Sequence, residues 1–434
     1  MNSPQDNPNH SPGMDAPPPA LRLRWLMIGF AFSATVINYL DRQVLSVVAA
    51  SPDFKATIPL TDAAYGYIAS AFMFAYAVSN GLSGPFIDRV GTRIGYACCM
   101  IWWSVAGIFH AVARGPLSLG CFRFLLGVGE AGNWPAAAKL VTEWFSVQER
   151  ALASGIFNSG ASLGSVISPL VIVWVVATWG WRSAFIAMGG LGLLWVVAWW
   201  FTYKVPPKLA GEVPGSSVPA LKLMRTRFVT GFTLSKVFMD PVWYFFVFWF
   251  PKYLAEVHHF SLKEIGWKAW IPYFTAVLGN IAGGVLTGWL MRRGMAVSVA
   301  RKTSTAVFAL LMVSTIPAIL TGNSWLAIAL ISLTTFGYTG YLANTLAFPG
   351  DVFPKQAVAS VWGLASMGSG FGGMLFMALS GWLIGRYGYT PVFIGYGILP
   401  LLALACILFL IGPLRADARF QSTGTTPSPL NSSP

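Results

Sequence analysis

The sequence predicts an all-α membrane protein whose twelve transmembrane helices form two pseudo-symmetric six-helix bundles. The first observation is composition: 55% of the 434 residues are hydrophobic and 10% are charged, whereas a soluble domain carries about 25% charged residues. The second is the number of apolar runs long enough to cross a bilayer, and the third is an internal resemblance between the two halves. A mean hydropathy of +0.62 agrees, and together these observations exclude a soluble protein.

Each predicted span is an apolar run close to the roughly 20 helical residues that a bilayer core requires. The uncharged run 303–350 is 48 residues long, and the turn-like segment Thr321–Ser324 divides it into two spans. Three further spans carry internal charge, at 25–50, 115–138 and 228–254. The remaining spans are uncharged runs at 63–87, 94–113, 151–181, 183–203, 269–291, 356–385 and 387–414.

Basic residues determine the predicted orientation. Of the 28 Lys and Arg, 18 fall on the side of the two chain ends, 7 on the other side and 3 inside spans. Because cytoplasmic loops hold the excess of Lys and Arg, both termini are predicted to be cytoplasmic, and the net charge of +13 is assigned to topology. Residues 1–21 and 421–434 are expected to be disordered, the latter within a C-terminal cytoplasmic tail, 415–434. Without a signal peptide or loop cysteines, a bacterial inner membrane is the expected location.

One long connection divides the predicted spans into two sets of six. Residues 204–227 contain Pro, Gly, Ser and five basic residues and follow span six. This cytoplasmic linker separates an N-terminal bundle, 22–203, from a C-terminal bundle, 228–414. The segment Ala151-Leu-Ala-Ser154 returns as Ala357-Val-Ala-Ser360. Two parallel repeats place a substrate site near the bilayer midplane between them, which is the layout of a transporter.

The connection between the second and third spans carries a family marker. It reads Gly84-Pro-Phe-Ile-Asp88-Arg89-Val-Gly91-Thr-Arg93 and resembles the signature loop G-x-x-x-D-R-x-G-x-[RK] of the major facilitator superfamily. Glycines allow two helices to approach closely, and an acid complements a helix N-terminus or a basic neighbour. The resemblance implies the major facilitator fold and a conformational latch made of Gly84, Asp88, Arg89, Gly91 and Arg93.

Two charged spans hold the candidate coupling site. Arg123 and Glu130 share one helix face at a separation of roughly 10 Å of rise, too far for a direct ion pair, so each needs a partner, for which span one is the candidate. There Asp41 and Arg42 lie near mid-membrane, where charged residues face a bundle interior and are paired or functional. In one interpretation Asp41 and Arg123 form a purely structural salt bridge. In the other, Asp41 and Glu130 take up protons while the planar fork of Arg42 binds a substrate carboxylate.

Four motifs narrow the resemblance. Asn38-Tyr-Leu-Asp-Arg42 and the segments 70–76, 127–137 and 149–160 resemble the anion:cation symporter family, and within it bacterial hexuronate transporters, which import glucuronate and galacturonate with protons. The resemblance implies proton binding by Asp41 and Glu130, with Arg123 as the partner of Asp41. It also implies substrate contacts by Tyr39, Arg42 and Tyr76 and, from the second half, by Asn344 and Ser366. The other candidate substrate-binding residues are Asn158, Trp243, Tyr244, Tyr338 and Tyr341.

Aromatic residues in this set have two possible roles. Tyr and Trp would stack on the C–H face of a sugar while their polar tips bind hydroxyls. The alternative for Tyr76, Trp243, Tyr244 and Tyr341 is ordinary packing or an interfacial belt.

The sequence departs from these relatives where sugar hydroxyls would bind. Galactonate-type relatives carry Gln where this chain has Ala161, and the tenth span of hexuronate relatives often shows His-Gln followed by Trp where it reads Tyr338-Thr-Gly-Tyr341. The predicted function is a proton-coupled symporter of a sugar-acid anion such as glucuronate or galacturonate. Another organic anion (an aldonate or aldarate) and export of metabolites or drugs are the alternatives. Span five lacks the Gly-Pro motif of antiporters, which disfavours export.

Other features argue against further classes. No P-loop is visible, so the proton gradient is the expected energy source and no cofactor is expected. The four His residues lack metal-ligand spacing, and no nucleophile–base pair suggests an intramembrane enzyme; a non-transporting receptor stays an alternative. Lys236 and Asp240, four residues apart, are expected to form a local ion pair. The expected partners are an organic anion, protons and the lipid bilayer, without nucleic acid, and the functional unit is a monomer.

Overall fold

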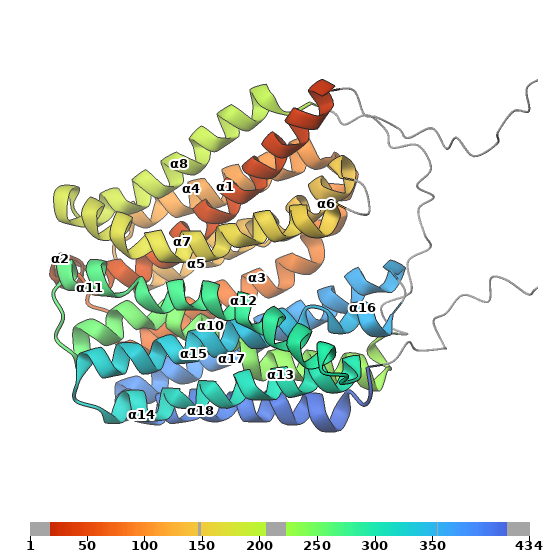
Figure 1. Cartoon of the computed structure of the whole chain (residues 1–434). Helices are drawn as coiled ribbons and strands as arrows, with labels where there is room; N and C mark the ends of the chain where they lie inside the picture. The colour runs from red at the N-terminus through yellow and green to blue at the C-terminus, as the bar shows by residue number, and fades with distance from the viewer. Residues whose placement is uncertain (1–17, 146–148, 205–222, 354, 415–434) are drawn as a thin grey trace, which may run out of the picture.

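The computed structural model of the chain describes residues 18–145, 149–204, 223–353 and 355–414. Most of the predicted linker, 204–227, and most of both predicted tails lie outside the described residues. Figure 1 shows two bundles of helices, one coloured red to yellow-green and the other green to blue. The first contains α1 (Pro18–Val48), α2 (Pro52–Thr57), α3 (Asp62–Val90), α4 (Thr92–Phe109), η1 (His110–Val112), α5 (Pro116–Glu130), α6 (Asn133–Trp144), α7 (Arg150–Trp179) and α8 (Trp181–Thr202). The second contains α10 (Arg227–Val257), α11 (Leu262–Lys268), α12 (Ile271–Arg292), α13 (Val297–Leu311), η2 (Met312–Ser314), α14 (Thr315–Leu320), α15 (Ser324–Thr345), α16 (Phe348–Val352), α17 (Lys355–Tyr387), α18 (Thr390–Ala405) and η3 (Cys406–Leu410).

Helix boundaries follow local sequence signals. The break predicted at Thr321–Ser324 is confirmed, because α14 ends at Leu320 and α15 begins at Ser324. Gly91, Gly180 and Gly388 join consecutive helices with φ of 83°, 83° and 74°, a backbone region that suits glycine. The first helix begins at Pro18, so the last four residues of the predicted tail 1–21 are helical.

Membrane-crossing character is clear for most helices. Within the described residues, nine helical segments are long and apolar enough to cross a membrane. The three predicted spans outside this group are α3, the pair α5–α6, and α10. They pack against other helices, α3 against α5 and α17, and α10 against α17 and α18. Over the described residues the chain is therefore an all-helical membrane protein.

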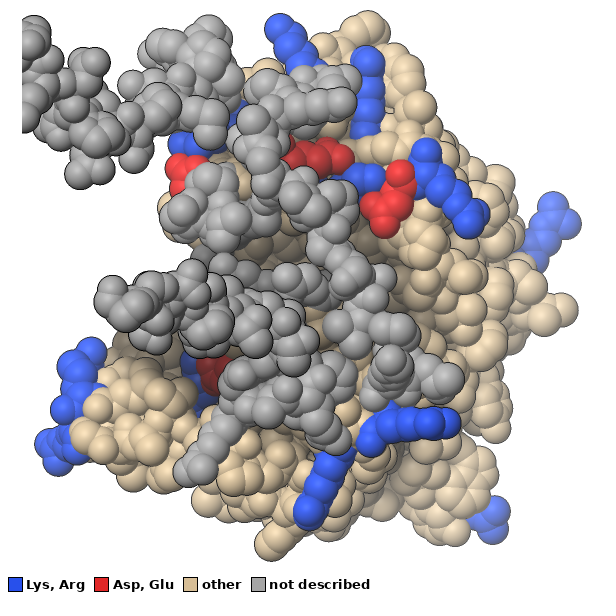
Figure 2. Space-filling view, turned by 90° about the vertical axis from the view of Figure 1, so that its right-hand side faces the viewer, with Lys and Arg blue, Asp and Glu red and all other residues tan. Residues whose placement is uncertain are grey.

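The two ends of the bundles differ in charge. Helix α1 begins and η3 ends on the right of Figure 1, which we call the terminal side, whereas α2 and α11 lie on the opposite side. Figure 2 looks onto the terminal side and shows Lys and Arg around its rim, with few Asp and Glu. This distribution agrees with the excess of basic residues that the sequence analysis assigned to the side of the chain ends.

On the opposite side the two bundles are packed together through α3 and α17. A Cβ atom added at Gly66 would lie 2.6 Å from the Cα of Gly381, and one added at Gly370 would lie 2.4 Å from the Cβ of Ala77. The Ser70 hydroxyl donates across the same contact to a carbonyl of α17 at 2.8 Å. The glycine-rich segment of α17 is thus a helix-packing surface, as its sequence predicts.

On the terminal side the same two helices separate. Gly363 and Gly84 continue the contact faces of α17 and α3, at seven-residue steps from Gly370 and Ala77, yet an added Cβ at either glycine meets nothing within 4 Å. Asn158 of α7 is likewise exposed. Among the described residues, the interface between the bundles is therefore closed on the opposite side and open on the terminal side.

Candidate functional site

The centre of the first bundle holds an ion pair between α1 and α5. Arg42 donates from Nε and Nη2 to Oε2 of Glu130, at 3.0 and 2.8 Å. Nη2 also donates to Oδ1 of Asn38, one turn earlier on α1, at 3.2 Å. The two charged side chains are 3% and 0% exposed. The sequence analysis required a partner for Glu130 in span one, and Arg42 is that partner.

Three aromatic rings surround the Arg42 guanidinium. Its Cζ lies 5.0 Å from the ring centroid of Tyr39, 5.3 Å from that of Phe72 and 4.9 Å from that of Tyr76. Arginine stacks favourably on aromatic faces, so the rings hold the guanidinium in place while leaving its charge intact. Sequence analysis singled out both tyrosines; it missed Phe72, although this residue lies inside the 70–76 motif.

Arg123 and Asp41 lie beside this pair without a direct contact. Nη1 of Arg123 donates to the backbone carbonyl of Arg42 at 3.3 Å, while its Nε and Nη2, and Oδ2 of Asp41, have no hydrogen-bond partner. Asp41 is 4% exposed and faces α4, where a Cβ added at Gly107 would lie 3.6 Å from Oδ1. Asp41 and Arg123 interact electrostatically, but the direct salt bridge between them is absent from the described residues.

Aromatic side chains of α10 and α15 form the facing wall in the second bundle. Trp243 and Tyr338 stack with their centroids 5.2 Å apart and an interplanar angle of 13°. Trp243 also meets Tyr273 edge to face at 6.0 Å. Tyr341 follows Tyr338 on α15 and is 2% exposed. This wall has the apolar ring surfaces that could stack on a sugar.

Side chains of α10 lie at the contact between the two bundles. The Tyr244 hydroxyl is 3.1 Å from Oγ of Ser369 on α17, and a Cβ added at Gly373 of α17 would lie 3.1 Å from the Tyr244 ring and 2.5 Å from Cε of Met73 on α3. Helix α1, which carries Tyr39 and Arg42, packs against α10, which carries Trp243 and Tyr244. Predicted substrate residues from both halves of the chain therefore meet at one place between the bundles.

A second buried charge pair lies along α10. Nζ of Lys236 is 2.9 Å from Oδ2 of Asp240, so the local ion pair that the spacing predicts is confirmed. The Tyr338 hydroxyl donates to Oδ1 of Asp240 at 3.2 Å, and Nζ of Lys236 lies 5.2 Å from the ring centroid of Trp362. The two charged residues are 7% and 4% exposed. Sequence analysis did not count them as site residues, because their spacing had already provided each with a partner.

Three predicted substrate residues lie away from this centre. The Asn344 amide donates to Oγ of Ser304 at 3.0 Å and accepts from the Thr287 hydroxyl, which keeps its polar atoms inside the second bundle. Asn158 is exposed on α7 and Ser366 is half-buried on α17. In this conformation Asn344 holds α15 against its neighbours, while the other two are on elements that border the open terminal side.

The signature loop occupies the terminal end of the first bundle. Asp88 is paired with Nζ of Lys139 on α6 at 3.0 Å. Gly91, with φ of 83°, ends α3, and Arg93 donates to a carbonyl of α8 at 2.7 Å. Arg89 is exposed. The loop segment therefore ties the end of α3 to α6 and the beginning of α4 to α8.

An ion-pair cluster joins the bundles on the opposite side. Lys252 of α10 contacts Asp62 of α3 and lies 2.6 Å from Oε2 of Glu256. Lys55 of α2 is 3.1 Å from Oε1 of Glu256, and the Tyr389 hydroxyl donates to Oε2 at 2.8 Å. Glu256 follows the predicted span 228–254; burial acts to raise its pKa, but Lys252, Tyr389 and Lys55 together hold that pKa below its ordinary value.

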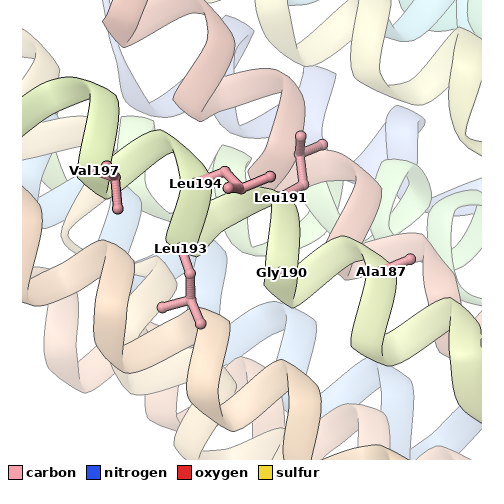
Figure 3. A pocket seen from close by; sticks show the side chains of 6 residues that line it. All are labelled: Ala187, Gly190, Leu191, Leu193, Leu194 and Val197. Carbon is pink, nitrogen blue, oxygen red and sulfur yellow. The ribbon is translucent and has the colours of Figure 1, made fainter.

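The outer surface of α8 carries an apolar groove, shown in Figure 3. Leu194 and Val197 on its walls are 68% and 55% exposed, as expected of side chains that face lipid. The groove has no charged or hydrogen-bonding side chain for an anion. Its lining residues are Ala187, Gly190, Leu191, Leu193, Leu194 and Val197.

Within the described ranges, no group of three or more His, Cys, Asp or Glu side chains is placed to hold a metal ion.

Comparisons with known proteins identify what the chain is similar to. Residues 31–313 and 294–432 match the family described as the Major Facilitator Superfamily. A hexuronate transporter of Escherichia coli strain K12 is 32% identical over 426 residues, which cover 94% of this chain and 98% of the relative. A D-galactonate transporter of Escherichia coli O6:H1 is 27% identical and covers 91% of this chain and 97% of its own length. The crystal structure of a D-xylose–proton symporter matches with a TM-score of 0.75 at 12% identity, over 90% of this chain and 98% of that one.

Proposed function

The chain belongs to the major facilitator superfamily, and from this premise we propose that this membrane transporter imports a hexuronate, such as glucuronate or galacturonate, together with protons. The observation that carries the proposal is the contact between Arg42 and Glu130. The same hydrogen bonds join the guanidinium fork of Arg42, which can bind an anion, to the carboxylate of Glu130, which can take up a proton. A proton on Glu130 therefore changes what Arg42 can bind. The similarity to a hexuronate transporter supports the class of anion.

The charges at the centre support coupling to protons. With every group ionised, three acids and three bases sum to zero. A monoanion added to this buried set leaves one uncompensated negative charge unless a carboxylate takes up a proton, and an uncompensated buried charge costs several kcal/mol. At least one proton should therefore accompany each monoanion. The six residues are Asp41, Arg42, Arg123, Glu130, Lys236 and Asp240.

The geometry supports a sequence of events at Arg42. Protonation of Glu130 weakens its ion pair with Arg42, and the freed guanidinium binds the substrate carboxylate through two parallel hydrogen bonds. Asp41, which has an unpartnered oxygen, would take a second proton. If both acids are protonated for one monoanion, each cycle moves one net positive charge inward, worth about 2.3 kcal/mol per 100 mV.

We further propose that the terminal side is cytoplasmic and that the membrane is a bacterial inner membrane, because the basic residues concentrate on that side. The described conformation is then open to the cytoplasm, and the Lys252 cluster closes the outer side. One copy of the chain contains both walls of the site, which supports a monomer as the functional unit.

The test is uptake of labelled glucuronate and galacturonate by cells that express the chain, with and without a protonophore. We expect protonophore-sensitive accumulation that Asp41→Asn abolishes. Asp53→Asn, at an exposed position of α2, is the matched control and should transport like the wild type. Accumulation that the protonophore does not reduce would contradict coupling to protons. Accumulation that persists in Asp41→Asn would contradict a coupling role of this residue. Absence of uptake from protein shown to be in the membrane would reject hexuronates and direct the assay to aldonates and aldarates.

A further inference from the structure

We infer that Lys236 and Asp240, together with the ring wall of Trp243 and Tyr338, form a second subsite that binds neighbouring hydroxyl groups of the substrate while Arg42 binds its carboxylate. The inference rests on the proposed function, because it requires a polyhydroxy acid as the substrate. It assigns a ligand-binding role to a pair that spacing alone explains as a local helix contact.

The position of the pair is the first argument. Lys236, Asp240 and Tyr244 follow one another at four-residue steps and so lie along one face of α10. Tyr244 is the member of this face that lies at the contact with the first bundle, where a Cβ added at Gly373 would be 3.1 Å from its ring and 2.5 Å from Cε of Met73, and α10 packs there against α1, the helix of Arg42. Asp240 is one helical turn away, about 6 Å along the axis, towards the terminal side. A substrate whose carboxylate is on Arg42 would extend its ring along this face.

The unused hydrogen-bonding capacity of the pair is the second argument. Asp240 accepts one bond on each oxygen, from Lys236 and Tyr338, whereas a carboxylate offers about four acceptor sites. An ammonium group has three donors, and within the described residues Lys236 has one carboxylate partner. Both groups can therefore bind further polar atoms without losing the contacts they already make.

The neutrality of the pair determines the ligand chemistry. A second carboxylate that approached Lys236 would also meet Asp240, whose oxygen is 2.9 Å from the ammonium. A hydroxyl group can accept from Lys236 and donate to Asp240, and two neighbouring hydroxyls can do both at once. Trp243 and Tyr338 provide a stacked ring surface beside the pair, which suits the C–H face of a sugar ring.

A purely structural role explains the pair less well. Replacing a buried ion pair by apolar residues is often neutral or stabilising, and charged residues inside membrane helices usually mark substrate or ion pathways. The ion pair itself lies within a single turn of α10, and it contacts other helices through one hydrogen bond from Tyr338 and the ring of Trp362, contacts that do not require both charges. Binding of hydroxyl groups supplies the reason for keeping two charges in this position.

The experiment measures how strongly two unlabelled competitors inhibit uptake of labelled glucuronate. One competitor is D-glucuronate itself, and the other is tetrahydropyran-2-carboxylate, which has the ring and the carboxylate but no hydroxyl groups. The wild type should prefer D-glucuronate strongly. In Asp240→Asn and in the double variant Lys236→Gln/Asp240→Asn, we expect the ratio of the two inhibition constants to fall about tenfold, because hydrogen bonds to charged groups are lost for glucuronate alone.

The control is the double variant Glu264→Gln/Lys268→Gln, which removes another ion pair of the same spacing at the surface of the second bundle and should leave the ratio unchanged. If Asp240→Asn does not reach the membrane, Asp240→Glu keeps the charge but displaces the carboxylate, and the same fall is expected. If the wild type transports uronates but the two inhibition constants change by the same factor in the variants, or do not change, this inference alone is overturned. A wild type that transports no uronate overturns the proposed function and this inference together.

Discussion

The two bundles hold their central charges in different ways. In the first bundle Arg42 and Glu130 are 88 residues apart and join α1 to α5, whereas in the second bundle Lys236 and Asp240 are neighbours on one turn of α10. A proton or a small shift of one helix breaks a pair between helices, but a pair within a turn persists when its helix moves as a rigid body. We infer that the first bundle is the responsive half of the site and the second is the constant half.

The unsatisfied polar atoms show the same contrast. Next to Arg42, Oε1 of Glu130 and Nδ2 of Asn38 have no hydrogen-bond partner, while both oxygens of Asp240 are bonded. Buried polar atoms without partners are costly unless water, a proton or a ligand completes them. Binding of a substrate and protons should therefore lower the free energy of the first bundle more than that of the second.

The largest expected effect tests the guanidinium of the responsive half. Arg42→Lys keeps a positive charge but loses the planar fork that contacts Glu130 and would bind a carboxylate. Because disrupting a buried charge pair costs about 3–5 kcal/mol, kcat/KM for glucuronate uptake should fall by roughly 100-fold or more. Arg386→Lys, at the exposed end of α17, should transport normally. Uptake by Arg42→Lys within threefold of the wild type would remove Arg42 from the site.

The next effect separates the roles of the two acids. Glu130→Gln imitates a permanently protonated carboxylate, so it should still exchange labelled for unlabelled substrate across the membrane but should lose uphill accumulation. The double variant Lys236→Gln/Asp240→Asn removes one base and one acid, so the charge balance of the centre is unchanged. It should keep proton-driven accumulation and change the affinity for hydroxylated substrates. Counterflow exchange and accumulation, measured on the same membranes, distinguish these outcomes. If this double variant lost accumulation while Glu130→Gln kept it, the assignment of responsive and constant halves would be reversed.

Much of the fold could be predicted from the sequence because its determinants are local. The lengths of the apolar runs, the break at Thr321–Ser324 and the glycine turns all depend on a few consecutive residues. The Lys236–Asp240 pair was predicted for the same reason, since four residues define it. Even the partner of Glu130 could be assigned to span one, because a buried charge in a membrane helix must be paired.

What the sequence could not predict depends on contacts between helices. The rings of Tyr39, Phe72 and Tyr76 come from two helices, and only their packing places them around Arg42. Asn344 looks like a substrate ligand in its motif, yet its amide is engaged inside the second bundle. The absence of direct contact between Asp41 and Arg123 was also beyond reach, because the distance between two helices depends on the conformational state and not on spacing along the chain.

A smaller effect concerns the movement of the two bundles that closes the terminal side. Gly66 faces Gly381 and Ala77 faces Gly370, and the same antiparallel register, continued along the helices, places Gly84 opposite Gly363. We expect these two glycines to meet when the terminal side closes. A variant that carries Gly84→Cys and Gly363→Cys should transport more slowly even when reduced, because the added side chains crowd this close contact. Oxidation should cross-link the helices and slow uptake several-fold further, and a reductant should reverse that further loss.

The control for this cross-link is Leu82→Cys with Gly363→Cys, because Leu82 is two residues from Gly84 and so lies on the other face of α3, where it is 66% exposed. A cross-link at the control pair, or one between positions 84 and 363 that leaves uptake unchanged, would show that α3 and α17 close in a different register. Close approach of α3 and α17 would then not explain the glycine at position 84 of the signature loop.

The smallest expected effect concerns the closed side and its pH dependence. The lowered pKa of Glu256 means that its contribution to closure is present above its ordinary value of 4.5 and is lost only as the pH falls through the lowered pKa. From about pH 5.5 to about pH 8 the cluster should therefore stay charged. Glu256→Gln should change the uptake rate about two- to threefold, in line with a partly exposed ion pair, by the same factor at every pH in that range. The central carboxylates would then account for the pH dependence of uptake. If the midpoint of that pH dependence moved in Glu256→Gln, part of the proton response would lie on the closed side, outside the Arg42 pair.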